Sequence, residues 1–243
     1  MKTKLLFLGL LLVSCNSDEK PSVQDDLILS PSYIVMYTKG ELKIDDRVDF
    51  WSIEHTNKAT GYCVSFLNPD GVTSDEFVRL SERNGDTSFN NYLSDYDRRS
   101  NICFADNFRS IHFVSDADWD ATHPAGSSLD DIVTVMLSSY APFVQSGYDR
   151  NAPGLSQWGA YTFYQRHASE LTEKEMAMIG WQGIGFYFDT APDDPTQVHT
   201  ITVTLQTVDG ETLTVTGRGT PPWGDYEPVS YTHLRAHETL ANL

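Results

Sequence analysis

Three aspartates alternate along the segment DADWDATHPAGSS, which begins at Asp116. Asp116, Asp118 and Asp120 have the spacing that calcium loops use, because three carboxylate oxygens can then converge on one hard cation. An EF-hand also needs glycine at the sixth place and glutamate at the twelfth, where this chain has Ala121 and Ser127. The three aspartates are therefore a weak Ca²⁺ candidate, and the alternative is a solvated acidic loop or a capping turn.

Two pairs of neighbouring acids have the residue types of a glycosidase, Asp95 with Asp97 and Asp193 with Asp194. That chemistry needs two carboxylates about 5–10 Å apart, a separation that spacing along the chain does not give. The segment GLSQWG, from Gly154 to Gly159, is one residue too long for a nucleophile elbow. Among the other side chains that support chemistry are four scattered histidines: His55, His112, His167 and His199. We predict no catalytic residue from these patterns and expect a protein that is not an enzyme.

Aromatic side chains are the stronger indication, because amphipathic rings suit surfaces that stack on sugars. The chain has twelve tyrosines and five tryptophans, at positions 51, 119, 158, 181 and 223. Most of them belong in the core, and we expect at most one exposed aromatic patch. The segments GTPPWGDY (219–226) and SDADWDATH (115–123) are the expected places for it.

Two cysteines, Cys63 and Cys103, lie in apolar, strand-like segments. Outside the cytoplasm, a disulfide between them would stabilise the fold by roughly 4 kcal/mol through loop closure. We predict this disulfide, with two separately buried free thiols as the alternative.

The N-terminus has the pattern of an export signal. The apolar run Leu5 to Val13 follows two lysines and is too short to cross a membrane, which takes about 20 residues in a helix. Leu12 to Cys15 resemble the lipobox of bacterial lipoproteins, which implies cleavage before Cys15 and acylation of its thiol. Residues 1–15 are then a signal peptide and residues 16–32 an acidic tether. The start of that tether, residues 16–19, resembles the surface-export signal of Bacteroidota-type lipoproteins, which favours the outer membrane.

The C-terminal segment VSYTHLRAHETLANL (229–243) differs in composition from the rest of the chain. It resembles adapter read-through found on unrelated environmental sequences, and we interpret it as a non-native tail. A short amphipathic helix is the alternative.

The charge balance excludes one class of partner. The chain has 17 basic and 34 acidic residues, so it offers no basic face for neutralising phosphates. We expect a membrane partner through the lipid and no nucleic acid.

Between tether and tail, short runs rich in β-branched and aromatic residues predict strands. These runs are residues 32–37, 48–54, 61–66, 109–114, 131–137 and 183–188. The segment 199–217 alternates threonines with apolar residues on both sides of Asp209-Gly210, which predicts a hairpin with one solvated face. Thr172 and Glu175 form a capping-box pattern that predicts a helix over 172–180.

These elements predict one mainly β domain over residues 33–228, an antiparallel, Ig-like sandwich with a small helical insertion. An open α+β sheet is the alternative. With the stretch HPAGSSLDDIV (123–133), the chain resembles small uncharacterised Bacteroidota lipoproteins, and this resemblance implies no activity. We expect a lipid-anchored module that binds a glycan, a peptide or an envelope protein without a cofactor, Ca²⁺ being the one weak candidate. The alternatives are a cell-surface hydrolase with a carboxylate pair and a structural envelope component.

Overall fold

The computed structural model describes residues 29–45 and 62–219. Several sequence predictions fall outside these residues: the signal with Cys15, the strand at 48–54, His55, Trp51, Trp223 and the segment 229–243. Strands dominate the described part, as predicted. In chain order the elements are β1 (Met36–Asp45), β2 (Tyr62–Gly71), α1 (Ser74–Asn84), α2 (Asp97–Ser100), β3 (Ile102–Phe104), β4 (Phe108–Ser115), β5 (Val133–Ser139), α3 (Ala141–Gln145), β6 (Thr162–His167), η1 (Ala168–Glu170), β7 (Ile179–Phe188), β8 (His199–Thr207) and β9 (Thr212–Gly219).

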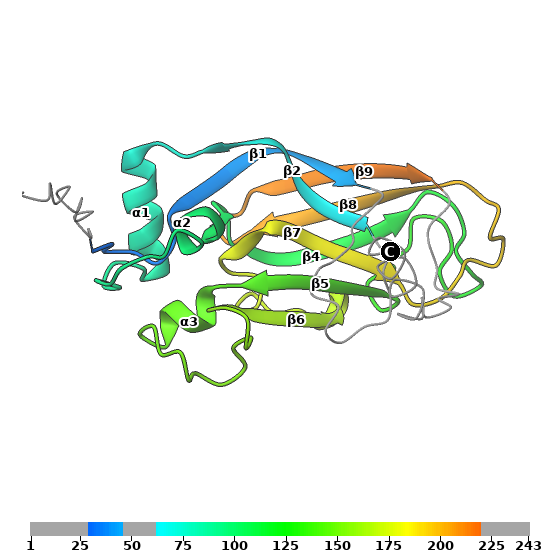
Figure 1. The fold of residues 1–243 in the computed structure, drawn as a ribbon. Helices are drawn as coiled ribbons and strands as arrows, with labels where there is room; N and C mark the ends of the chain where they lie inside the picture. Colours follow the sequence, from blue (N-terminus) through cyan, green and yellow to red (C-terminus); the bar gives the residue numbers. More distant parts are fainter. Residues whose placement is uncertain (1–28, 46–61, 220–243) are drawn as a thin grey trace, which may run out of the picture.

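The strands form two sheets. The large sheet has six strands in the order β2-β1-β3-β7-β5-β6, and the small sheet has three in the order β4-β8-β9. All pairs are antiparallel except β1 with β3, so the large sheet is mixed. Figure 1 shows the small sheet packed against the large one, in the two-layer arrangement that was predicted.

The large sheet also closes on itself at one side. Strand β2 pairs with β1 over most of its length, and its first residues, Tyr62–Val64, pair with β7. Strand β3 likewise pairs with both β1 and β7. Strands β2, β1, β3 and β7 therefore form a closed ring of pairings.

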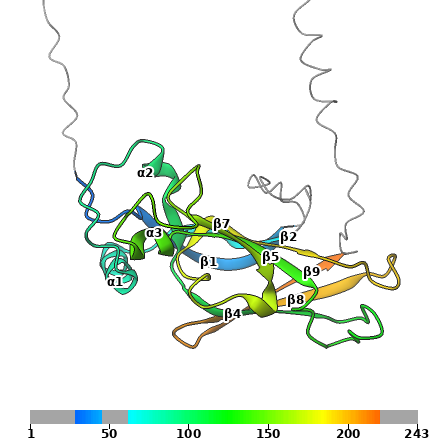
Figure 2. The same cartoon turned by 90° about the horizontal axis from the view of Figure 1, so that it is seen from below.

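Apolar residues from facing strands fill the space between the sheets. From the small sheet, β8 contributes Ile201, Val203 and Leu205, and from the large sheet β7 contributes Ile184 and Phe186, all nearly inaccessible to solvent. Alternation places every second side chain of a strand on the same face, so the intervening threonines of β8 point outward. A second apolar cluster lies under the three α-helices at one end of the molecule (Figure 2).

The hairpin is confirmed by β8 and β9, with Gly210 at a φ of 91° in the turn. The predicted helix at 172–180 is wrong. Only half of its capping box forms: the N–H and the hydroxyl of Thr172 both donate to the carboxylate of Glu175 at 2.9 Å, whereas the N–H of Glu175 donates to the backbone carbonyl of Thr172. The chain makes only one turn, because Met178 adopts a φ of 50° and Ile179 starts β7.

The longest helix, α1, was not predicted from the sequence. Thr73 caps it by accepting a hydrogen bond from the N–H of Glu76, and Gly85 ends it at a φ of 73°. In the part of the chain that the structure describes, no helix combines the length and the apolar character needed to span a membrane.

Candidate functional site

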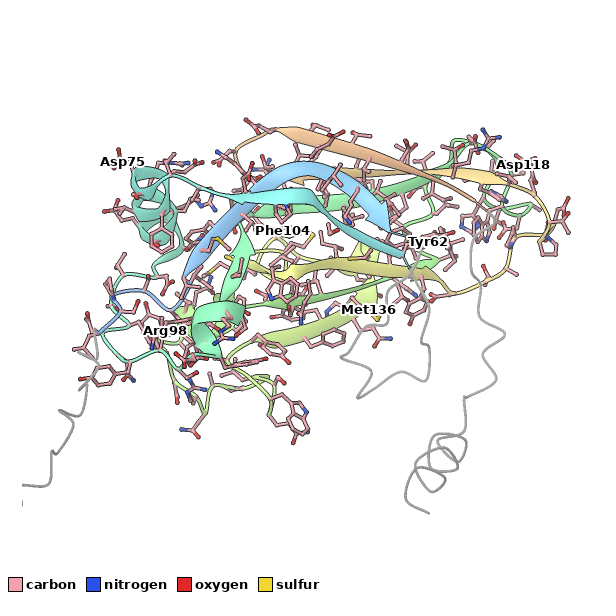
Figure 3. All side chains as sticks on the ribbon, turned by 45° about the horizontal axis from the view of Figure 1, so that its top comes forward. Tyr62, Asp75, Arg98, Phe104, Asp118 and Met136 are labelled. Atoms are coloured by element: carbon pink, nitrogen blue, oxygen red, sulfur yellow. The ribbon has the colours of Figure 1, made fainter. Side chains whose placement is uncertain are left out.

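The three alternating aspartates lie in the loop between β4 and β5, at the end of the molecule opposite α1, as Asp118 and Asp75 mark in Figure 3. Their carboxylates bind different groups: Asp116 accepts from the N–H of Thr200 and Asp118 from that of Ala125, both at 2.7 Å. Asp120 accepts from the N–H groups of Thr122 and His123. Among the residues described, no three metal-ligating side chains are arranged to hold an ion. The structure does not bring these aspartates together. Only Asp120 caps its own turn, whereas Asp116 and Asp118 accept from N–H groups farther along the chain.

His123 lies between two carboxylates in the same loop. Its Nδ1 is 2.9 Å from Asp120 and its Nε2 is 3.2 Å from Asp131. Burial of the ring lowers its pKa, but the two carboxylates outweigh that effect and leave the pKa above its usual value. The pair of contacts fixes the end of the loop against the start of the next strand.

Trp119, expected in an exposed patch, is completely buried, and that prediction is wrong. Its ring stacks on Phe188 with 4.3 Å between centroids and closes the end of the core between the sheets. Two other tryptophans are exposed, Trp158 at 68% and Trp181 at 53%.

The acid pairs proposed for a glycosidase act locally. Asp97 accepts hydrogen bonds from Ser94 at the start of α2, and Asp194 accepts from Thr196 in the next turn. Asp95 forms an exposed ion pair with Arg98 at 3.3 Å.

Three of the four scattered histidines are described, and each contacts a different partner. His112 binds Asp130 at 2.8 Å, and His167 binds Asp189 at 2.7 Å. His199 binds Ser115 at 2.8 Å and is fully buried. The Ser156 hydroxyl of GLSQWG accepts a hydrogen bond from the N–H two residues later, which is a turn contact.

The predicted Cys63–Cys103 disulfide is not formed, and both cysteines are buried as thiols. Both cysteines pair with β7, Cys63 opposite Gly185 and Cys103 opposite Gly180. On β1, Cys63 lies opposite Asp45 and Cys103 opposite Tyr37. The eight residue steps between these positions span roughly 20–25 Å of strand, whereas a disulfide needs Cα atoms within about 7 Å. The alternative of two separately buried thiols fits the structure.

The feature that the sequence analysis missed is a bulge in β7. Leu137 and Ser139 of β5 pair with Ile184 and Ile179 of β7, so a single β5 residue faces residues 180–183. Residues 180–183 leave the pairing with β5 and form an arch, although Gly180 still pairs with Cys103 of β3. Such an arch changes the direction of the side chains that it carries. Such bulges are over-represented beside functional sites.

Two glycines allow the arch. Gly183 has a φ of 89°, and a Cβ there would lie 2.5 Å from the carbonyl oxygen of Val64. At Gly180 a Cβ would lie 2.6 Å from the hydroxyl of Ser138. No side chain fits either position without movement of its neighbours, so the arch depends on these two residues.

Trp181 and Gln182 lie on the crest of the arch and are exposed. The side-chain carbonyl of Gln182 accepts a hydrogen bond from Ser138 at 3.2 Å, and its backbone carbonyl accepts one from the Cys63 thiol at 3.2 Å. The carboxamide is thus held in place from below. Its Nε2 makes no hydrogen bond to the described part of the protein and is available as a donor.

One buried tyrosine lies beside the arch. The ring of Tyr140 lies 3.7 Å from the position of a Cβ on Gly180, and its hydroxyl donates to the carbonyl of Ser100 at 2.9 Å. Burial raises the pKa of Tyr140 well above its usual range, and nearby Tyr33 and Cys103 add a smaller effect. We use the name bulge surface for Trp181 and Gln182. This surface offers one flat indole ring and one neutral carboxamide.

Comparison with known proteins adds no relative. The chain matches no protein-family model, no curated protein and no solved structure at a significant level. The candidate site therefore depends on its own geometry.

Proposed function

We propose that this protein is a lipid-anchored envelope lipoprotein that binds a carbohydrate chain on the bulge surface. The observation that carries the proposal is Trp181, which stays half exposed on an arch fixed by glycines and hydrogen bonds. Tryptophan is enriched at interfaces, because its ring system is largely apolar and its N–H can still bond to water or to a ligand.

The chemistry of the bulge surface favours a neutral, hydroxyl-rich ligand. An indole face stacks on the C–H face of a sugar ring, in the way that amphipathic aromatic residues serve wet interfaces. The carboxamide of Gln182 then donates to a sugar hydroxyl beside the ring. Because Ser138 holds that carboxamide, little conformational entropy is lost when the ligand binds.

Replacing Trp181 with alanine is expected to weaken carbohydrate binding about tenfold, since one stacking contact is worth about 0.5–1.5 kcal/mol beyond the buried area. The measurement is affinity electrophoresis of the purified protein in gels that contain soluble glucan, mannan, xylan or galactan. Trp181→Phe keeps a ring and should retain part of the binding. Tyr92→Ala, which removes an exposed aromatic side chain outside the bulge surface, is the matched control. If none of the four polysaccharides retards the protein, or if Trp181→Ala is retarded as strongly as the native chain, the proposal is wrong.

The anchoring part of the proposal rests on the sequence around Cys15. We expect an alkyne analogue of palmitate, fed to a bacterial host that expresses the full chain, to label the protein. Cys15→Ser should abolish the label completely, because the thiol is the acylated group, whereas Cys63→Ser should leave it unchanged. Labelling that persists in Cys15→Ser would refute the anchor. Digestion of intact cells with a protease then separates surface display from a periplasmic location.

A further inference from the structure

The outer face of the small sheet carries an ordered array of threonines. On β8 and β9 the register places Thr202 opposite Thr216 and Thr204 opposite Thr214. Thr212 extends the row on β9. The pairing of the two strands runs without a bulge from His199–Gly219 to Gln206–Thr212.

The array has a regular two-dimensional spacing. Alternate residues of a strand lie about 6.6–6.8 Å apart, and opposed residues of neighbouring antiparallel strands lie about 4.5–5.5 Å apart. Threonine is branched at Cβ and restricted at χ1, so its hydroxyl and methyl groups hold their places without a ligand. The positions are thus set by the backbone.

Within residues 29–45 and 62–219, no other group of the protein bonds to the central hydroxyls of this array. Thr202, Thr204, Thr214 and Thr216 are half-buried or exposed, and their hydroxyls make no hydrogen bond within the described part of the chain. Thr200 differs, because its hydroxyl binds Asp116. Cross-strand threonine pairs stabilise a sheet in any case, but that role does not need free hydroxyls.

The array is also uncharged, in a chain whose formal net charge is −17. In its two central cross-strand pairs, Thr202–Thr216 and Thr204–Thr214, both residues are threonine. On the third strand, β4, Val114 lies opposite Thr202 and His112 lies opposite Thr204. The ring of His112 is hydrogen-bonded to Asp130. Arg218 lies at the edge of the array, opposite Thr200.

We propose that this threonine array binds ice. A regular grid of uncharged hydroxyl and methyl groups offers a small ligand several equivalent positions. A ligand whose own surface repeats can contact all of these positions at once. The spacings are similar to those between oxygens on the prism faces of ice. A crystalline polysaccharide also repeats, yet the array has no aromatic ring on which sugars stack. The array belongs to a different sheet from the bulge surface, so the two proposals stand independently.

The test is the growth of ice crystals in the presence of the purified full chain. The native protein should slow ice recrystallisation at micromolar concentration and partition into a slowly growing ice shell. Thr214→Tyr and Thr202→Tyr should each reduce both effects at least tenfold. Tyrosine suits a strand as well as threonine does, so these variants keep the fold while a bulky ring lifts the array off the crystal.

Thr190→Tyr is the matched control, because Thr190 is exposed in the loop after β7 and lies outside the array. Circular dichroism and the thermal midpoint confirm that each variant is folded. Ice activity that is absent from the native chain, or that survives in both array variants, would overturn the proposal. So would retention on microcrystalline cellulose that the array variants abolish. Trp181→Ala should leave ice activity unchanged, which separates this result from failure of carbohydrate binding.

Discussion

Replacing Trp119 with alanine is expected to lower the free energy of unfolding by about 3–5 kcal/mol, the usual cost of removing a large buried aromatic side chain. Trp119 has no exposed surface, stacks on Phe188 and lies 5.2 Å from the ring of His199. Its backbone carbonyl also accepts a hydrogen bond from the N–H of Asp193, in the loop after β7, at 2.8 Å. The loss should appear as a lower urea midpoint in equilibrium unfolding followed by far-ultraviolet circular dichroism.

Trp119→Phe distinguishes packing from hydrogen bonding. The indole Nε1 of Trp119 has no hydrogen-bond partner in the described structure, so phenylalanine should recover a large share of the lost stability. Trp158→Ala removes an indole that is 68% exposed and should change stability by no more than about 0.5 kcal/mol. Equal losses for Trp119→Ala and Trp158→Ala would show that Trp119 does not close the core.

Asp86→Ala should be similarly damaging at the other end of the molecule, with a loss of about 3–4 kcal/mol. The Asp86 carboxylate is fully buried and accepts hydrogen bonds from the N–H groups of Tyr33 and Ile34, at 2.7 and 2.8 Å, and from the hydroxyl of Tyr148. Alanine would leave two buried N–H groups without an acceptor, each at about 1–3 kcal/mol. Urea unfolding again gives the value.

Two further variants make this result interpretable. Asp75→Ala removes an exposed acid from the first turn of α1 and should cost only about 0.3–1 kcal/mol through the helix dipole. Asp86→Asn keeps one acceptor oxygen and places an amide N–H₂ against a donor, so its loss should be intermediate. If Asp86→Ala is no less stable than Asp75→Ala, the carboxylate does not hold the chain before β1 to the end of α1.

The hairpin was predictable because its information is local. The alternation of threonines with apolar residues gives each strand of the hairpin a solvated face and a buried face, and Gly210 supplies the positive φ at the turn. Helix α1 has equally local signals in Thr73, Glu76 and Gly85, which the sequence reading did not use. At 172–180, by contrast, tertiary structure overrides the capping box, because Met176 and Ile179 are buried in the core.

The bulge and the cysteines show what a single sequence does not contain. The arch at 180–183 exists because β5 pairs with β7 on both sides of it, and that register is set by strands more than forty residues apart. The sequence suggests it only through Gly180 and Gly183, which flank Trp181-Gln182. Likewise, two cysteines in strand-like segments look suitable for a disulfide until the sheet order assigns each to a different end of β7.

The closed ring of β2, β1, β3 and β7 has a consequence for the order of folding. Cys63 and Gly185 are neighbours in the sheet although more than a hundred residues separate them along the chain. A nascent polypeptide that ends before β7 lacks the strand that joins β2 to β3. Strands β2 and β3 then each have an unpaired edge where β7 will later bind. Such long-range closure is slow, because the entropy of a large loop must be lost before its contacts form. We therefore expect the protein to reach its native state late in synthesis, after the last third of the chain has emerged.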